Sequence, residues 1–413
     1  MPTLLQINPA KNILSTGKIV EQIGVIAEEK GWKCYIASAS RYTRSGKIEH
    51  LKIGGLVSEY FHAFFFSTLL DMNGLGSYIA TKRLISKIKR IKPDVIHLHN
   101  LHGHYINYKL IFEYLKESGI PVVWTLHDCW SFTGGCSYFE FTGCEGWKHN
   151  CRNCAYKGGY PMSTIVNRAS KNYILKKKLF TSLDNLTIVA VSKWLGNLAS
   201  QSFLRKYPIK TIYNGIDTDV FKSSQNTLRD KLGLNGKFVM IAVASVWIPE
   251  KGLNDYIKLS KILKENEELI LIGINSEVKK ILPDRILSIP KTSNQKELAE
   301  YYSMADVLLN LSYQETFGLT TIEAMACGTP AIVYNKTASP ELILPETGFI
   351  VEAGDIEGIR KAINILETKG KEKYSYACKK HAEEEFSKSV CYQKYIDLYN
   401  NLISVSFQNW RID

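Results

Sequence analysis

The 413-residue sequence contains no long hydrophobic run. Its longest apolar stretch, residues 61–70, is about half the length of a helix that crosses a bilayer, so we expect no membrane-spanning segment. Residues 1–14 lack the basic start and apolar run of a secretion signal, so we expect a cytoplasmic protein. The sequence also lacks low-complexity tracts and short repeats, which argues against disordered and repeat architectures.

Acidic residues are scarce in the first half of the chain. Residues 1–205 contain 26 Lys and Arg against 13 Asp and Glu, whereas residues 206–413 contain 26 against 27. Nearly all of the net charge of +12 therefore belongs to the first half. Two interpretations remain open: a solvated basic face, or attraction to an anionic surface such as nucleic acid or anionic lipid.

Cysteine is abundant, with nine residues, and five of them lie between residues 129 and 154. Because no secretion signal is found, a disulfide framework is disfavoured. The segment 133–159 fits neither a strand nor a helix, and an irregular insert of this length is usually functional or held by something. Four of its thiols would suit a structural, tetrahedral zinc site, with reduced structural cysteines as the alternative: Cys136, Cys144, Cys151 and Cys154.

The chain is too long for one ordinary core, so we expect two domains. Both halves alternate short apolar runs with helical patterns, which predicts parallel sheets covered by helices on both faces. We place the domain boundary at residues 205/206, where a polar joining segment begins. The expected strands are residues 3–9, 34–40, 94–100, 121–128 and 186–192, and then 237–245, 268–274, 305–312 and 330–334.

The stretch around Gly318 predicts an anion-binding turn. The expected strand 305–312 leads to a turn at Gly318 and then to a helix over about residues 319–327. The backbone N–H groups of Gly318, Leu319 and Thr320 would then point out of the carboxyl edge of the sheet. That geometry binds phosphate.

Two carboxylates flank this turn, Glu315 before it and Glu323 one turn inside the helix. A phosphate alone would not need them, but a nucleotide sugar would, because carboxylates accept hydrogen bonds from hydroxyl groups. We expect Glu323 to bind the ribose and Glu315 to bind the sugar. A helix with a favourable acidic first turn is the alternative.

The stretch 315–330, ETFGLTTIEAMACGTP, resembles the E-x7-E signature of the retaining glycosyltransferases of family 4, which have the GT-B fold. Three further stretches are similar to other motifs of the family, and the second of them is typical of its colanic-acid, capsule and exopolysaccharide enzymes. They are STGKIVEQIG (15–24), TLHDCWSFTGGC (125–136) and TGFIVEAGD (347–355).

The resemblance implies an α/β protein of two doubly wound, Rossmann-like domains that face each other across a cleft. Residues 1–205 would form the acceptor-side domain, which carries the cysteine-rich insert 133–159. Residues 206–413 would bind the nucleotide sugar, and their last helix would pack back on the first domain.

The family signature also implies which residues act. Catalytic roles fall on His127, at the end of an expected strand, on Lys251 and on Glu315. Family members usually stabilise the leaving diphosphate with an arginine and a lysine, but this chain has Ser245 near the arginine position. The implied donor-binding residues are Gly17, Ser245, Lys251, Glu315, Phe317, Gly318, Leu319, Thr320 and Glu323, and the implied acceptor-side residues are His102 and Asp128.

Other polar residues are assigned structural roles. Asp217 and Asp219 form a D-x-D pair in a joining loop rather than after a core strand, so we interpret them as loop caps. His97 and His99 alternate along an expected strand and therefore face one side together, as half-buried structural histidines. Without a D-x-D in a suitable place, we expect catalysis to need no metal or other cofactor.

The family implies sugar transfer from a nucleotide diphosphate, with retention at the anomeric carbon, to a glycan or polyprenyl-diphosphate-linked acceptor in surface polysaccharide biosynthesis. We expect no nucleic-acid partner. The basic half would hold the protein on the anionic inner face of the cell membrane. The aromatic stretch 61–66 and the basic helix near residues 82–92 would make the contacts, unless these aromatics pack internally.

Two alternative functions remain open. A nucleotide-sugar 2-epimerase shares the fold, but it would need an internal acid–base pair and no acceptor. A zinc-containing nucleic-acid-binding protein would use the basic half and the cysteines. That alternative leaves the helix that carries Glu323 unexplained.

Overall fold

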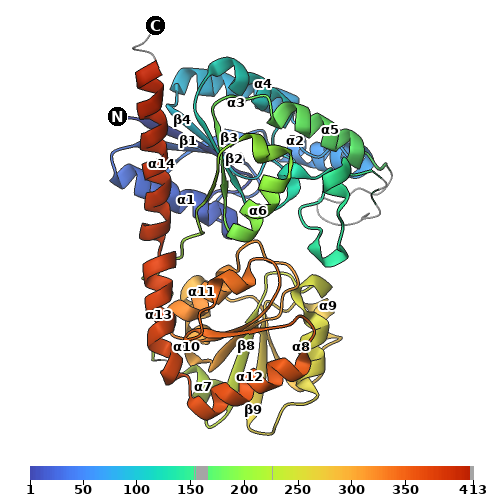
Figure 1. Ribbon diagram of the computed structural model, residues 1–413, viewed down its shortest axis with the longest axis vertical. Coiled ribbons are helices and arrows are strands. Elements are labelled where there is room, and N and C mark those ends of the chain that lie inside the picture. Colours follow the sequence, from blue (N-terminus) through green and yellow to red (C-terminus); the bar gives the residue numbers. More distant parts are fainter. Residues whose placement is uncertain (153, 155–165, 226, 410–413) are drawn as a thin grey trace. The chain divides into compact units, whose positions relative to one another are not determined.

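The computed structural model describes residues 1–152, 154, 166–225 and 227–409. The chain forms two compact units, which we call the first unit (Met1–Tyr213 with Cys391–Asp413) and the second unit (Asn214–Val390). The division falls between residues 213 and 214, compared with 205 and 206 from the sequence. The last part of the chain, red in Figure 1, returns to the first unit.

The first unit is built on a sheet of seven parallel strands in the order β3-β2-β1-β4-β5-β6-β7. In the register of this sheet, Leu4 pairs with Cys34 on one side and with Val95 on the other. The strands are β1 (Thr3–Ile7), β2 (Lys33–Ala39), β3 (Glu49–Ile53), β4 (Val95–Leu98), β5 (Val122–Leu126), β6 (Leu186–Ala190) and β7 (Ile209–Thr211).

Helices connect these strands and cover both faces of the sheet (Figure 1). Helix α4 illustrates how the sequence sets their ends, because the Asn107 side chain accepts the N–H of Leu110 at its start and Gly119, at φ 66°, ends it. The α-helices are α1 (Leu14–Glu29), α2 (Leu56–Phe61), α3 (Tyr78–Ile91), α4 (Tyr108–Ser118), α5 (Ala169–Phe180) and α6 (Lys193–Gln201). Shorter elements are the π-helix η1 (His62–Leu69) and the 3-10 turns η2 (Trp130–Phe132), η3 (Glu140–Thr142), η4 (Gly146–His149) and η5 (Phe203–Lys206).

The second unit repeats the scheme with six parallel strands in the order β10-β9-β8-β11-β12-β13. The strands are β8 (Phe238–Val243), β9 (Glu267–Ile272), β10 (Ile286–Ile289), β11 (Val307–Asn310), β12 (Ala331–Tyr334) and β13 (Gly348–Val351). The helices are α7 (Leu228–Leu232), α8 (Leu253–Ser260), α9 (Ser276–Lys279), α10 (Gln295–Met304), α11 (Leu319–Ala326), α12 (Ile356–Lys369) and α13 (Glu372–Phe386), with the 3-10 turns η6 (Pro249–Lys251) and η7 (Ser339–Leu342).

The C-terminal helix α14 (Lys388–Asn409) packs into the core of the first unit. The ring of Tyr399 meets that of Trp32 edge-on at 5.6 Å between centroids. Its hydroxyl also bonds Nδ1 of His97 at 2.7 Å, while the hydroxyl of Tyr395 lies 3.0 Å from that of Thr125. Because these contacts are buried and specific, they fix the end of the chain against β4 and β5.

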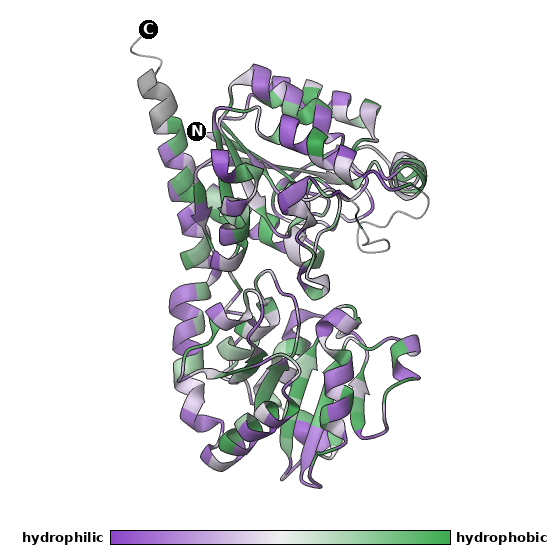
Figure 2. Cartoon of the chain, turned by 45° about the vertical axis from the view of Figure 1, so that its right-hand side comes forward, coloured by the Kyte–Doolittle hydropathy of each residue, from purple (hydrophilic) through white to green (hydrophobic). Residues whose placement is uncertain are grey.

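The nine strands predicted from the sequence are all present, which confirms the α/β class and the two doubly wound sheets. Figure 2 shows apolar residues concentrated in the strands and polar ones on the outer sides of the helices. Four strands were not predicted, and each is an edge strand: β3, β7, β10 and β13. Within the described residues, no helix combines the length and the apolar content that a membrane crossing requires.

Candidate functional site

The carboxyl edge of the second sheet carries Lys251. This residue ends the 3-10 turn η6, which follows β8, and Gly252 comes directly after it. Gly252 has a φ of 76°, and a Cβ there would collide with the carbonyl oxygen of Leu311. Only glycine therefore allows this turn to lie so close to the end of β11.

Lys251 forms an ion pair with Glu315, with 2.6 Å between Nζ and Oε1. The side chains are 30% and 18% exposed, so the pair stays open to solvent on one side. Glu315 is held from behind, because its N–H donates to Oγ1 of Thr337 at 2.8 Å and its carbonyl accepts from Ala338 at 3.2 Å. Two residues expected to act together from the sequence are thus in direct contact.

Gly318 and helix α11 follow Glu315. Gly318 has a φ of 103°, and the helix begins at Leu319, in agreement with the predicted turn and helix start. The side chains of Leu319 and Thr320 are half-buried. Because the first N–H groups of a helix have no partner within the helix, this end suits an anion.

Glu323 lies one turn inside α11, where its Oε2 accepts a hydrogen bond from the hydroxyl of Tyr302 at 3.0 Å. Burial, followed by the negative charge of Glu323, raises the pKa of Tyr302 well above its ordinary value. The phenol therefore stays protonated and orients the carboxylate. Sequence reasoning missed Tyr302, since no spacing links α10 to α11.

Two other residues assigned to donor binding differ in their exposure to solvent. The side chain of Phe317 is 2% exposed and packs against Phe386, with 5.9 Å between ring centroids, so only its backbone faces the turn. Ser245 is exposed in the bend after β8. Its hydroxyl can donate a hydrogen bond, but it cannot supply the charge of the arginine that is usual in this position.

The carboxyl edge of the first sheet carries His127 and Asp128, directly after β5. Nε2 of His127 lies 3.0 Å from Nδ1 of His99, and Nε2 of His99 lies 3.3 Å from Oε1 of Gln6. The Gln6 amide nitrogen donates to the carbonyl of Val20, so Oε1 accepts and His99 carries its proton on Nε2. His127 therefore donates from Nε2, and its Nδ1 is the nitrogen that accepts a hydrogen bond.

Three buried histidines of this unit, His97, His99 and His127, are neutral. Burial lowers the pKa of His127 to about 4, although the nearby Asp128 carboxylate opposes the shift. Burial also lowers the pKa values of His97 and His99 well below the ordinary one. The rings of these two residues lie on one side, with centroids 4.0 Å apart, as predicted, but the expectation that they are half-buried is wrong. Both are buried because α14 covers β4.

Asp128 and His102 form a second buried pair, with 2.7 Å between Oδ2 and Nε2. The other carboxylate oxygen accepts the N–H of Trp130 at 2.8 Å. Burial alone would raise the pKa of Asp128, but His102 and the Trp130 N–H together hold it below the ordinary value. The carboxylate is therefore ionised and fixes the orientation of the imidazole.

The stretch 15–24 resembles the first phosphate loop and helix of the family, which would place Gly17 in the loop, but the structure differs. Helix α1 starts earlier, at Leu14, and Gly17 is buried in its first turn. The chain reverses instead at Asn12 and Leu14, which have φ values of 52° and 60°. A Cβ on Gly17 would lie 3.0 Å from that of Ala10, so the glycine lets the loop pack closely against the helix.

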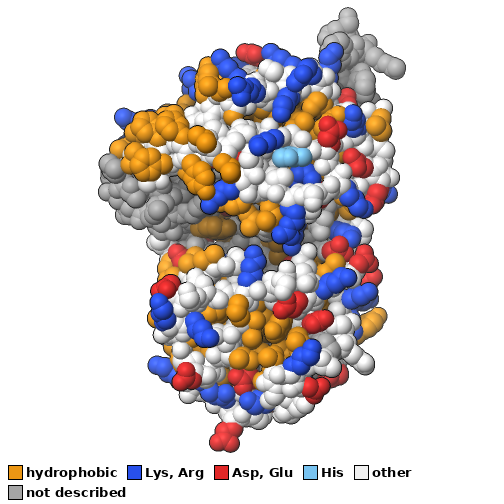
Figure 3. Space-filling model, turned by 180° about the vertical axis from the view of Figure 1, so that it is seen from behind, with side chains coloured by type: hydrophobic (Ala, Val, Ile, Leu, Met, Phe, Trp, Pro, Cys, Tyr) orange, Lys and Arg blue, Asp and Glu red, His pale blue; other side chains and the backbone are white. Residues whose placement is uncertain are grey.

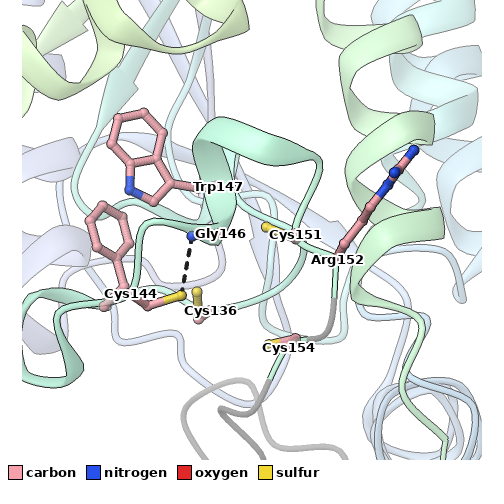
Figure 4. A pocket seen from close by; sticks show the side chains of 8 residues that line it. Cys136, Cys144, Gly146, Trp147, Cys151, Arg152 and Cys154 are labelled. Carbon is pink, nitrogen blue, oxygen red and sulfur yellow. Dashed lines mark hydrogen bonds between the residues drawn. The ribbon is translucent and has the colours of Figure 1, made fainter.

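The four cysteines expected to bind zinc line one cavity, together with Phe139, Gly146, Trp147 and Arg152 (Figure 4). Burial raises the pKa of the Cys136 thiol to about 12 and that of Cys151 to about 11, so neither is a reactive thiolate. In the part of the chain that the structure describes, no three His, Cys, Asp or Glu side chains stand in a metal-binding arrangement.

Asp217 and Asp219 have the structural role that the sequence indicated. Oδ1 of Asp217 accepts the N–H of Asp219 at 3.1 Å, which is a local loop cap. Nζ of Lys388 lies 2.8 Å from Asp217 and 3.4 Å from Asp219. Both carboxylates thus share one lysine of the protein.

Comparison with known proteins defines the class of this chain. Two family models match it, Glycosyltransferase Family 4 over residues 28–220 and Glycosyl transferases group 1 over residues 224–385. The HepE protein of Anabaena, solved in complex with UDP, shares the fold, with a TM-score of 0.68 at 16% identity over 97% of this chain and 100% of that one. The chain thus has the GT-B fold of glycosyltransferases.

Within that class, the chain belongs to the glycosyltransferases of family 4. It is 25% identical over 273 residues to a glycosyl transferase assigned to colanic acid biosynthesis in Escherichia coli, a match that covers 64% of this chain and 65% of that protein. It is 33% identical over 192 residues to the N-acetyl-alpha-D-glucosaminyl L-malate synthase of Bacillus anthracis, or 43% of this chain and 50% of that enzyme. The chain therefore matches less than two thirds of the length of either relative.

Proposed function

We propose that this protein transfers a sugar from a nucleotide diphosphate, with retention at the anomeric carbon, to a lipid-linked glycan acceptor. The observation that carries the proposal is the Lys251–Glu315 ion pair next to the start of helix α11. It combines a cation for a diphosphate, helix N–H groups for the same anion and carboxylates for hydroxyl groups.

The chemical step separates charge, since the diphosphate leaves as an anion while the sugar becomes cationic in character. In our proposal Lys251 and the N–H groups of Gly318, Leu319 and Thr320 stabilise the leaving diphosphate. Glu315 accepts hydrogen bonds from the sugar and Glu323 from the ribose. A UDP sugar is the first donor to test, because the related HepE fold has been solved with UDP.

The residues of the first unit would then serve the sugar and the acceptor. His127 is neutral, with Nδ1 as its accepting nitrogen, so it suits a hydrogen bond from a sugar hydroxyl. The Asp128–His102 pair lies two residues before the turn η2 and orients polar groups at the same sheet edge. We assign this pair to the acceptor side.

A membrane-bound acceptor is supported by the surface of the first unit. Phe61, Phe64 and Phe65 are 59%, 64% and 41% exposed, so they do not pack internally. Figure 3 shows a group of exposed apolar side chains on this unit, with basic ones around it. Helix α3 adds exposed basic residues, which would attract anionic lipid: Lys82, Arg83, Lys89 and Arg90. We propose a cytoplasmic protein held peripherally on the membrane.

Incubation of the full chain with a panel of nucleotide sugars, with and without lipid-linked glycan, tests the proposal. Nucleotide diphosphate should be released in amounts that depend on the acceptor, and the product should keep the anomeric configuration of the donor. Release without acceptor, together with an isomerised sugar, would instead identify the 2-epimerase. Tight binding to duplex nucleic acid, without nucleotide-sugar binding, would favour the nucleic-acid-binding alternative.

A further inference from the structure

The cavity lined by the four cysteines lies in the irregular segment between β5 and α5, apart from the residues assigned to sugar transfer. Its volume is about 40 Å³, and its lining comes from Cys136, Cys144, Cys151 and Cys154 with two aromatic neighbours. Figure 4 shows these side chains arranged around one opening, contributed by successive turns of the segment. Four thiols at one cavity require an explanation, because nothing in the proposed sugar transfer uses them.

The described part of the segment has little regular structure. Between β5 and α5 its regular structure consists, in the described residues, of the short turns η2, η3 and η4. Its apolar contacts centre on Trp147, whose ring stacks on Phe139 at 5.4 Å and meets Phe132 edge-on at 5.6 Å. Small irregular folds often add a disulfide or a metal to a limited apolar core, and four cysteines are available here for that role.

Backbone N–H groups point at two of the sulfur atoms. The N–H of Gly134 donates to Sγ of Cys151 at 3.1 Å, and that of Gly146 donates to Sγ of Cys144 at 3.4 Å. Hydrogen bonds of this kind stabilise the deprotonated form of a sulfur ligand. Such hydrogen bonds are expected around a metal-bound thiolate.

A buried cation lies beside the cavity. Lys176 of α5 is 1% exposed, and its Nζ donates to the carbonyls of Trp130 and Thr133 at 2.7 and 3.3 Å. Oγ1 of Thr133 in turn donates to the carbonyl of Cys136 at 2.6 Å, so this ammonium lies close to the cysteine segment. A zinc ion with four thiolates carries a net double negative charge, which would suit a buried ammonium nearby.

We propose that Cys136, Cys144, Cys151 and Cys154 bind one structural zinc ion. Four thiols release their protons to solvent and form four zinc–sulfur bonds, with no change of oxidation state. Because no three of the described side chains already form a metal cluster, the ion would draw the thiols inward across the cavity. It would thereby fix the segment that follows His127 and Asp128. The proposal does not depend on sugar transfer.

The test is the metal content of the full chain, purified after expression with added zinc and measured by mass spectrometry. We expect about one zinc ion per chain. The Cys136→Ser/Cys151→Ser variant should lose it, whereas Cys129→Ala should keep it, since Cys129 lies in the same stretch but does not line the cavity. Iron in place of zinc, or zinc retained by the double variant, would overturn the assignment.

Two measurements on the wild-type chain hold even if the double variant fails to fold. Cobalt added to the zinc-depleted protein should give the visible absorption of a tetrahedral thiolate site, and zinc should abolish that absorption. Alkylation of Cys144, followed by mass spectrometry, should be slow with zinc and fast after chelation. No cobalt spectrum, alkylation indifferent to zinc, or a disulfide among the four cysteines would contradict the proposal.

Discussion

The two units place different chemistry at the same structural position, the carboxyl edge of a parallel sheet. The first unit holds eight of the nine histidines, and at its edge His99 and His127 are buried and neutral. The second unit places a partly exposed ion pair, Lys251 and Glu315, at the equivalent edge. Neutral imidazoles suit uncharged hydroxyl groups, whereas an accessible cation suits a diphosphate. In our proposal, one fold used twice therefore supplies a site for each kind of group.

The largest expected difference between the two units is their loss of stability in acid. In the first unit, burial lowers the pKa of His62 to about 3 and those of His104 and His127 to about 4. The unfolded chain binds protons on these residues below about pH 6.5, so stability is complete above that pH and is lost as pH falls towards 4. At about 1.4 kcal/mol per pKa unit and residue, we expect the first unit to lose several kcal/mol.

Hydrogen exchange read by mass spectrometry at about pH 7.5 and about pH 5 can report the two units separately. The second unit contains a single histidine, His381, whose pKa is lowered by burial, so its protection should change less. Equal losses of protection in both units, or a first unit that gains stability in acid, would contradict the proposal that buried neutral histidines make the first unit more sensitive to acid.

Removing the positive charge of Lys251 should impair turnover through the site of the second unit alone. Lys251→Ala should reduce kcat by about 10²–10³, the loss seen when one group that stabilises a developing negative charge is removed. Steady-state turnover with the preferred donor measures the effect. Lys261→Ala, at an exposed lysine after helix α8, is the matched control and should leave kcat unchanged. Wild-type kcat in the Lys251 variant would remove this lysine from the mechanism.

The sequence predicted the centre of each sheet better than its edges. Central strands such as β4 and β5 are buried throughout and read as continuous apolar runs. Two of the edge strands are partly exposed and polar, since β3 reads Glu-His-Leu-Lys-Ile and β7 reads Ile-Lys-Thr. Nothing in such short mixed runs separates them from loops, since their pairing comes from the neighbouring strand.

The candidate site was predictable where its residues share one local motif, as Glu315, Gly318 and Glu323 do. The residues that hold these carboxylates in place were not predictable, because they come from distant parts of the chain. Tyr302 reaches Glu323 from α10, and Thr337 reaches Glu315 from the segment after β12. Such contacts depend on how helices pack on a sheet, and no spacing in a single sequence records that.

Glu323→Ala should weaken nucleotide binding by about 1–3 kcal/mol, the scale of a hydrogen bond to a charged group. Tyr302→Phe removes the hydroxyl that orients this carboxylate, and it should weaken nucleotide binding less than Glu323→Ala does. Isothermal titration calorimetry with nucleoside diphosphates measures both. Unchanged affinity in Glu323→Ala would remove this residue from the ribose role. A larger loss in Tyr302→Phe than in Glu323→Ala would mean that the helix packing had changed instead.

Membrane binding should follow the charge of the first unit. Replacing Lys82 and Arg83 with Gln should weaken binding of the full chain to anionic vesicles by about 1 kcal/mol per residue. Phe64→Ser should reduce the part of the binding that resists salt, since this ring is 64% exposed. Co-sedimentation across a salt series measures both, because the screening length shortens as salt rises and electrostatic binding weakens with it. The matched control replaces two exposed lysines of the second unit, Lys279 and Lys280. Equal losses of vesicle binding from both pairs of substitutions would contradict the proposed peripheral membrane association.

The smallest expected effect is that of divalent cations on turnover. Asp217 and Asp219 are engaged with Lys388, so neither is placed to hold a metal with the donor diphosphate. In our proposal the cation Lys251 takes that part instead, so turnover should survive a chelator that removes magnesium and manganese. Activity abolished by the chelator and restored by either ion would show that the second unit needs a metal after all. Activity lost slowly and restored only by zinc would leave the donor site intact and place the defect in the first unit, where the proposed structural ion would fix the segment that follows His127.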